Sequence, residues 1–536
     1  MPMSSSHSPV TTMSATTNCC SSVRCATWGC SAPGDHAAGR SGAPEPPRST
    51  RRVRRRICAA YIRRRTMPIT ELDQRLTGQI VLSNRTYERL RALTALGTRF
   101  PGTPGERAAQ RFILDELRAA GLDPTIEEFE HLAWERGSAS LSVTAPVTRK
   151  LLCISLAGAP STPAGGIDGE ILYLGNGTPA EFDRHKDAIR DRIVLVTSLA
   201  PRQECSPPRQ CHRRTKYGRA VQYGAKAFLF MNSQPGMLPQ AGSTRQNREG
   251  EIPAVTIPFE DGEVLKSLLK AGPVSVHLEA TNRNYPHTTG NIVAELPGTD
   301  PDHVVLVGAH YDSHDNAVGA IDNGTGVVTV LELARLLSES GVRLRRTIRF
   351  VLFAVEEMAS VGSSFYVNRH RDHLDQIDLF MNIDGIGQQG AKTFDTQGFD
   401  DAADFILDVA KDIDYEMTIP NPAFSGDSLA FVMGGVPTAA MKGSKLRSLF
   451  GHQNLSTGED RGWGHTSADT FDKVEQHALH EAAIIAALTL IRAADHPTRM
   501  ARTRTKAEVD AILRETGMDT VLSFMQWPSI DVRPKE

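Results

Sequence analysis

The sequence predicts an α/β fold in which a mixed β-sheet is sandwiched by helices, with a second, mostly-β module inserted into the chain. Residues 304–309, 348–355 and 378–384 are short, nearly continuous apolar runs. Strands without polar alternation are covered on both faces, as in a sheet between two layers of helices. Within residues 165–285 the pattern changes to short β-branched runs separated by Gly and Pro, which is typical of a separate β-rich module.

Composition and charge narrow the class of protein. The chain has 536 residues, of which 40% are hydrophobic and 23% charged, enough to build the cores of more than one domain. Residues 1–66 carry a formal charge of +9, so the rest of the chain carries −11. An acidic body argues against nucleic acid as a partner, because phosphate binding needs clustered Lys and Arg. The apolar run 482–491 is too short to cross a bilayer, so we predict a buried helix there and no membrane partner.

The first 66 residues are rich in Ser, Pro, Gly and Arg and show no hydrophobic periodicity, so we expect them to be disordered. We interpret them as upstream sequence that is not translated, with translation starting at Met67. An organelle transit peptide and a nucleic-acid-binding tail are the alternatives. The segment lacks the apolar core of a secretory signal, and we expect a cytoplasmic protein.

Cysteine usage does not indicate a disulfide framework. Once residues 1–66 are set aside, three cysteines remain, Cys153, Cys205 and Cys211. Three are too few for a stapled scaffold. Cys205 and Cys211 either pair locally or stay free.

The remaining chain divides into four parts. Residues 67–164 form the first part of the main domain and include an amphipathic helix that ends at Gly121. Residues 165–285 form the inserted module and residues 286–500 the α/β catalytic part. Residues 501–536 are a C-terminal extension. The oligomeric state is not indicated.

Metal-competent side chains follow each of the three predicted core strands. They are His310 and Asp312 after 304–309, Glu356 and Glu357 after 348–355, and Asp384 at the end of 378–384. In open α/β sheets the reactive groups collect at the carboxyl ends of the strands, so we expect these side chains to converge. A mixture of histidine and carboxylate suits zinc.

Further ligand candidates lie in loops. Two metal ions about 3.5–4 Å apart need a carboxylate that bridges them. Asp322 is the best-placed candidate for this bridge. Alternatively, Asp322 or Asn323 could cap the following helix. Glu356 and Glu357 are adjacent, so both can serve one site only if the chain turns there. One can then ligate while the other acts as general base. His465, before a long helix, is the fifth candidate.

These segments resemble, in order and spacing, the motifs of the cocatalytic-zinc aminopeptidases of metallopeptidase family 28. The motifs are HYDS at 310–313, AIDNGTG at 320–326, EEMASVGS at 356–363, NIDGIG at 382–387 and HTSADTFDKV at 465–474. The likeness extends to the segment TRFPGTPG at 98–105, near the start of the main domain, and to the segment 425–441, which is similar to the family's substrate-side loop.

The resemblance implies the zinc exopeptidase fold and two Zn²⁺ ions per chain. His310, Asp322 and Asp384 would hold one ion, and Asp322, Glu357 and His465 the other. Glu356 would be the general base, and Asp312 would orient a ligand histidine. Where several members place a Tyr before the last histidine, this chain has Gly464.

The implied activity is hydrolysis of peptides by a zinc-dependent exopeptidase, with release of N-terminal residues as the leading hypothesis. A carboxypeptidase of the glutamate-releasing type is one alternative, and it needs Arg side chains beside the metals, for which Arg447 and Arg461 are candidates. A glutaminyl cyclase would use one zinc. A non-catalytic receptor of the transferrin-receptor type would lack ligands.

Residues 165–285 resemble a protease-associated domain. The likeness rests on the strand-like run 193–197, the pair Gly224-Ala225 and the Ile-Pro-Ala segment 252–254. Such modules are usually non-catalytic, which implies a lid or spacer. Because the module supplies no predicted ligand, we expect the metal site to form without it.

Overall fold

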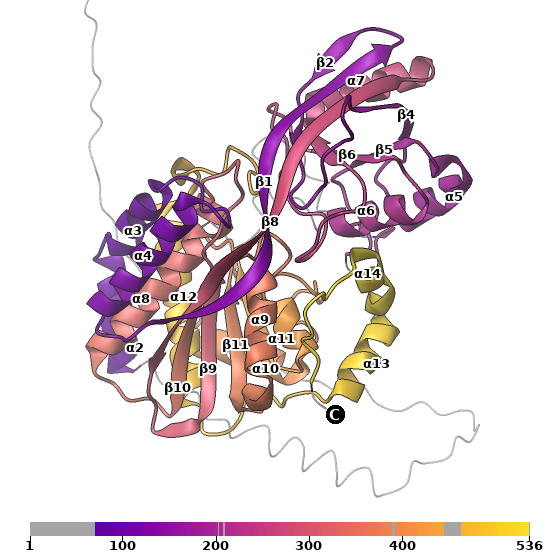
Figure 1. Cartoon of the computed structure of the whole chain (residues 1–536). Coiled ribbons are helices and arrows are strands. Elements are labelled where there is room, and N and C mark those ends of the chain that lie inside the picture. The colour runs from indigo at the N-terminus through magenta and orange to yellow at the C-terminus, as the bar shows by residue number, and fades with distance from the viewer. Residues whose placement is uncertain (1–69, 202, 207–208, 388–391, 444–461, 535–536) are drawn as a thin grey trace, which may run out of the picture. The chain divides into compact units, whose positions relative to one another are not determined.

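The computed structural model describes residues 70–201, 203–206, 209–387, 392–443 and 462–534 (Figure 1). The expectations for residues 1–66 and for Arg447 and Arg461 therefore fall outside the described residues. All of the described residues belong to one compact unit of the chain, which begins at Thr66.

A mixed sheet forms the centre of the catalytic part, as the apolar runs predict. Its strands lie in the order β13-β12-β14-β11-β9-β10-β8. The pairs β14/β11, β11/β9 and β9/β10 are parallel, while β8 is antiparallel to β10. The bounds are β8 Ser275–Leu296, β9 Asp300–His310, β10 Arg346–Phe353, β11 Ile377–Ile383, β12 Lys392–Asp395, β13 Met417–Thr418 and β14 Thr438–Lys442.

Helices cover both faces of this sheet, which explains why its central strands are apolar throughout. Val305, Leu306 and Val307 of β9 are all fully buried although their side chains alternate between the faces. Figure 1 shows one group of helices on the left of the sheet and another group in front of β11. The first comprises α2 Glu71–Val81, α3 Arg85–Thr94, α4 Pro104–Ala119, α8 Thr325–Ser340 and α12 Gln476–Asp495. The second comprises α9 Val361–Arg369, α10 Asp400–Asp412 and α11 Ser428–Met433.

Helix α4 ends as predicted. Thr103 caps its N-terminus by accepting from the backbone N–H of Glu106, and Pro104 occupies the first turn. Gly121 follows the helix with φ +79°, the left-handed conformation that glycine adopts at helix ends.

Two long antiparallel strands connect the catalytic part to the insert. β1 (Thr125–Ala145) and β8 (Ser275–Leu296) pair from Thr125↔Val293 to Ala145↔Ser275. The C-terminal end of β8 belongs to the central sheet, and its N-terminal end pairs with the insert strand β4. The predicted boundary after residue 285 therefore falls inside one continuous strand.

The insert contains more helix than its sequence pattern indicates. Its strands β4 Ile167–Tyr173, β5 Ile193–Thr197, β6 Ala227–Met231 and β7 Ala254–Ile257 form a parallel run in that order. The crossover from β4 to β5 contains α5 Pro179–Ile189, and the crossover from β5 to β6 contains α6 Arg213–Gln222. A third helix, α7 Phe259–Ala271, follows β7. The sequence of α6, RRTKYGRAVQ, has no apolar stripe, so hydrophobic periodicity could not reveal it.

The C-terminal extension joins the insert to the catalytic part. It contains α13 (Lys506–Thr516) and α14 (Met518–Met525), and α14 packs on α6. The carbonyl of Phe524 accepts a hydrogen bond from Arg245 of the insert (2.8 Å), and the indole N–H of Trp527 donates to the carbonyl of Ala359 (3.1 Å).

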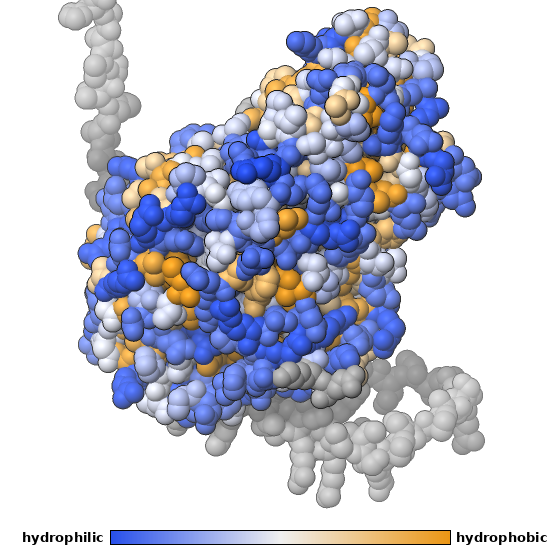
Figure 2. Space-filling view, viewed as in Figure 1, coloured by the Kyte–Doolittle hydropathy of each residue, from blue (hydrophilic) through white to orange (hydrophobic). Residues whose placement is uncertain are grey.

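The predicted buried helix at 482–491 lies within α12. In the described part of the chain α12 is long and apolar enough to span a membrane by length and composition, and 78% of its most apolar window is buried inside the protein. It packs against α8, β9 and β10, the position of a core helix. The face seen in Figure 2 is mostly hydrophilic, with hydrophobic residues in scattered areas.

Candidate metal centre

The five predicted ligands converge at the carboxyl ends of the central strands. His310 is the last residue of β9, Glu357 follows β10 and Asp384 follows β11. Asp322 lies in the turn before α8, and His465 in the loop that leads to α12. Potential ligand atoms lie within 4.8 Å of one another in each of two groups, one formed by His310, Asp322 and Asp384 and the other by His314, Glu357 and His465.

Asp322 links the two groups through its two carboxylate oxygens. Oδ1 lies 3.2 Å from Nε2 of His310, and Oδ2 lies 3.3 Å from Nε2 of His465. Asn323, not Asp322, accepts the hydrogen bond from the backbone N–H of Gly326 (3.0 Å) at the start of α8. The Asp322 side chain is therefore turned to the histidines, in the position of a bridging carboxylate.

The remaining spacings fit zinc. Zinc bonds of about 2.0–2.1 Å in a tetrahedron separate neighbouring ligand atoms by about 3.3 Å. Nε2 of His310 lies 3.8 Å from Oδ1 of Asp384, and Nε2 of His465 lies 3.3 Å from Oε2 of Glu357. Imidazole nitrogens and carboxylate oxygens in this proportion are ligands that zinc accepts.

The electrostatics of the groups also favour a bound cation. The pKa of the Glu357 carboxyl is raised well above its usual range, first by burial and then by the neighbouring carboxylates of Asp322 and Glu356. Burial alone would raise the pKa of Asp322 too, but the imidazoles of His310 and His465 hold it well below its usual range. A divalent cation would offset the repulsion among these carboxylates.

The chain turns at Glu356 and Glu357, as the pair of adjacent glutamates requires. Val355 has φ +61° and Ala359 φ +81°, conformations that end the strand abruptly. Glu357 is buried with the ligands, whereas Glu356 is partly exposed and accepts a hydrogen bond from the Ser360 hydroxyl (3.2 Å). The two carboxylates can thus perform different tasks at one site.

Asp312 holds both the turn and the first histidine. Its carboxylate accepts the backbone N–H groups of Glu356 (3.0 Å) and Glu357 (3.1 Å). Its Oδ1 also lies 3.4 Å from Nδ1 of His310, the nitrogen that faces away from Asp322. This arrangement suits the orienting role that the resemblance implies.

Two buried charged residues that the sequence left without a role support the ligand loops. The carboxylate of Asp469 accepts the backbone N–H groups of Ile321 (2.8 Å) and Asp322 (3.0 Å). Arg99, from the TRFPGTPG segment, donates to the carbonyls of Tyr311 (2.7 Å) and Gly319. Burial raises the pKa of Asp469 to about 7, although these backbone bonds lower it.

The insert contacts the metal groups directly. The carbonyl of Ala241 lies 3.2 Å from Nδ1 of His465, and the N–H of Ala241 donates to the carbonyl of His465 (2.8 Å). The Ser243 hydroxyl donates to the carbonyl of Glu357 (2.9 Å). These bonds orient two predicted ligands, which is at odds with the expectation that the site forms without the insert.

The insert also supplies the basic wall of the cavity over the metal groups. One cavity is lined by the insert residues Arg209, His212, Arg213 and Arg214 and by the catalytic residues Asp322, Glu356, Glu357, Asp384, Ser425, Gly426, Lys442 and His465. Ser425 and Gly426 belong to the predicted substrate-side loop. The insert therefore faces the metal centre, as a lid would.

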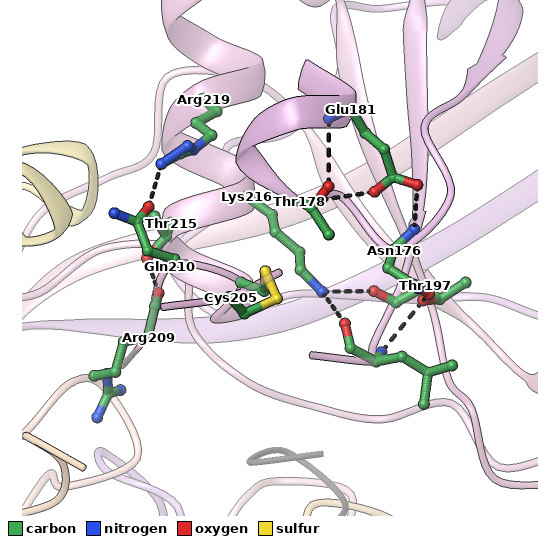
Figure 3. The surroundings of a disulfide bond; sticks show 12 residues. Asn176, Thr178, Glu181, Thr197, Cys205, Arg209, Gln210, Thr215, Lys216 and Arg219 are labelled. Atoms are coloured by element: carbon green, nitrogen blue, oxygen red, sulfur yellow. Dashed lines mark hydrogen bonds between the residues drawn. A yellow bond between two sulfur atoms is a disulfide. The ribbon is translucent and has the colours of Figure 1, made fainter. Parts of the chain in front are cut away.

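A disulfide organises the loop that carries this basic wall. Cys205 and Cys211 are bonded, so the local pairing is confirmed over the free alternative. Figure 3 shows Arg209 pointing away from the disulfide, and one of its nitrogens donates to the carbonyl of Phe424 in the catalytic part (3.1 Å). His212 caps the N-terminus of α6. The loop is therefore anchored to α6 through His212, and it contacts the catalytic part through Arg209.

Tyr311, although adjacent to His310 in sequence, does not face the cavity. Its buried hydroxyl donates to the carbonyl of Gly290 (3.0 Å). It is therefore not available to stand in for the tyrosine that Gly464 replaces.

Comparison with known proteins agrees with the sequence motifs. Residues 291–490 match the model of peptidase family M28, and residues 144–265 match the PA domain. Carboxypeptidase Q of Rattus norvegicus is 28% identical over 438 residues, covering 77% of this chain and 86% of that protein. Probable leucine aminopeptidase 2 of Arthroderma benhamiae is 29% identical over 288 residues, covering 53% of this chain and 54% of that protein.

Solved structures share the fold. The peptidase M28 precursor of Shewanella amazonensis superposes with a TM-score of 0.67 at 24% identity, covering 81% of this chain and 98% of its own. BSAP, a zinc aminopeptidase from Bacillus subtilis, superposes with a TM-score of 0.60 at 23% identity, covering 78% and 97%. The mixed sheet with a PA domain inserted before the metal-binding half is therefore the fold of this chain.

Replacing Gly242 tests whether the insert orients the ligands. A Cβ at Gly242 would lie 1.9 Å from Cζ of Arg213, and the residue has φ +151°. Alanine rarely adopts a φ of +151°, and the Arg213 side chain that its Cβ would meet donates to the carbonyl of Ser243 (3.2 Å). Gly242→Ala should therefore disturb the 241–243 segment and weaken zinc retention roughly tenfold, the lower end of the usual effect of removing outer support from a ligand. Zinc retention against a chelator measures this.

Gly272→Ala is the matched control, because Gly272 also lies in the insert with φ +159° but has open space around its Cα. Equal zinc retention in the two variants would show that the 241–243 segment does not position the ligands.

Proposed function

We propose that this chain, whose residues 291–490 match the model of peptidase family M28, is a two-zinc exopeptidase. His310, Asp322 and Asp384 would hold one zinc ion, and Asp322, Glu357 and His465 the other. The single observation that carries this proposal is the carboxylate of Asp322, whose two oxygens each face a histidine of a different ligand group.

The catalytic roles follow from where the chain's own carboxylates lie. Two zinc ions bound here would polarise the peptide carbonyl and lower the pKa of the attacking water. Glu356 lines the cavity without belonging to either ligand group. It would accept the water proton and then donate it to the leaving amine. Asp312 would act as a positioning residue through its bonds to the Glu356 and Glu357 backbone.

The completeness of the ligand set argues against the rival classes of protein. A non-catalytic receptor needs no ligands, yet all five predicted ligands converge here within the described residues. A one-zinc cyclase would not require a carboxylate placed between two ligand groups.

The basic wall favours a second candidate selectivity, recognition of a free carboxylate. Within the described lining of the cavity, Asp322, Glu356, Glu357 and Asp384 all serve the metals or the base, which leaves no further acid there for a substrate ammonium. Arg209, Arg213 and Arg214 stand on the opposite side, and guanidinium groups bind carboxylates well. The Rattus norvegicus relative that aligns over most of its length is named a carboxypeptidase.

We therefore propose that the substrate is a short peptide whose free C-terminal carboxylate lies against the insert. The leading hypothesis from sequence, release of N-terminal residues, is the competing outcome.

Hydrolysis of dipeptides that differ only at their termini decides between the two selectivities. C-terminal amidation should abolish cleavage, while N-acetylation should be tolerated, because the insert presents cations to the carboxylate. The reverse pattern would establish aminopeptidase selectivity.

Arg213→Gln should raise the KM of the free dipeptide about tenfold or more, the usual worth of a hydrogen bond to a charged group. Arg219→Gln is the matched control, since Arg219 lies on the same helix but packs over Phe524 and donates to Gln210. Equal KM values for both variants would contradict carboxylate binding by the wall.

The two adjacent glutamates should respond differently to neutralisation. Glu356→Gln should keep both zinc ions but lose roughly two or more orders of magnitude in turnover, the typical worth of general-base catalysis. Glu357→Gln should bring zinc content towards one per chain, because an amide is a poorer ligand than a carboxylate.

Metal analysis beside peptide hydrolysis measures both effects. Excess zinc should partly restore Glu357→Gln and leave Glu356→Gln inactive. Reversed phenotypes would mean that base and ligand are assigned the wrong way round.

A further inference from the structure

A third histidine reaches the metal centre, and the sequence motifs give it no role. His314 lies four residues after His310 and is 1% exposed. Its Nε2 lies 2.9 Å from Oε2 of Glu357. Its ring packs against the ring of His465, with centroids 4.1 Å apart and planes at 69°.

We propose that His314 is a fourth protein ligand of the zinc ion held by Asp322, Glu357 and His465. The inference rests on the proposed two-zinc centre and adds a residue that the family motifs do not include. It assigns the second ion four ligand side chains and the first ion three.

Convergence of ligand atoms supports this assignment. Nε2 of His314 and Nε2 of His465 approach the same oxygen of Glu357, at 2.9 and 3.3 Å. Nε2 of His465 also lies 3.3 Å from Oδ2 of Asp322. These separations are close to the roughly 3.3 Å expected between neighbouring ligand atoms of tetrahedral zinc.

The alternative role for His314 is to donate a hydrogen bond that orients Glu357. One donor would suffice for that purpose, and the Glu357 segment is already fixed by Asp312 and Ser243 through its backbone. Two imidazole nitrogens within 3.3 Å of one buried oxygen are better explained as ligands that share a cation.

The proposal predicts unequal affinities at the two sites. Four protein ligands close a zinc site, whereas three leave a position open. The ion at His314, Glu357 and His465 should therefore be retained more tightly than the ion at His310 and Asp384.

Zinc titration of the full chain in metal buffers tests this. The wild-type protein should bind two zinc ions with different affinities. His314→Ala should weaken the tighter one by more than the roughly tenfold that loss of a merely supporting group can cause, because a direct ligand is removed. Substitution with Co²⁺ gives a readout independent of activity, since loss of an imidazole should change the visible absorption of the bound ion. His480→Ala, at a buried histidine on α12, is the control.

His314→Gln separates ligation from orientation, because a glutamine side chain can still donate to Glu357 but is a poor zinc ligand. Weakened zinc binding in both His314 variants, with thermal unfolding close to wild type, is the expected result. Wild-type affinity in His314→Gln would overturn the inference and leave the proposed function intact. Absence of a second zinc ion in the wild-type protein would overturn both.

Discussion

The structure depends on burying several carboxylates at the ends of three strands. Asp312, Glu357 and Asp384 lie within a few residues of buried apolar segments of β9, β10 and β11, and Asp322 joins them from the turn before α8. Burying an ion costs several kcal/mol even after the protein relaxes, unless partners compensate it. Two imidazoles, backbone N–H groups and, in our account, two zinc ions provide that compensation. The sheet determines where these carboxylates and imidazoles converge, and the loops after its strands determine the orientation of their side chains.

Segments far apart in sequence keep the ligand loops in place. Gln246 of the insert donates to the carbonyl of Ala359 (2.8 Å), and its side-chain oxygen accepts the backbone N–H of Ser529 from the C-terminal extension (2.7 Å). Asp469 and Arg99 similarly hold the turn that carries Asp322. The insert and the extension are therefore parts of the metal centre's support, and β1 and β8 connect the insert to the central sheet.

Local patterns predicted the sheet, the clustering of candidate ligands at its strand ends and the turn at Glu356 and Glu357, because each leaves a signal within about ten residues. The positions of His314, Arg99 and Arg213 at the site depend on contacts between segments distant in the chain, such as Arg99 with Tyr311 and His314 with Glu357, and no local pattern encodes these. His314 in particular looks like an ordinary loop histidine until the fold brings it to Glu357. Hydrophobic periodicity does not reveal the helix α6 for a related reason, since several of its buried side chains are charged.

The central claim is that Asp322 bridges two zinc ions. Anomalous diffraction at the zinc edge, from crystals of the full chain grown with zinc, tests it most directly. We expect two peaks about 3.5–4 Å apart, one on each side of the Asp322 carboxylate. A single peak, or two peaks that do not share Asp322, would contradict the account.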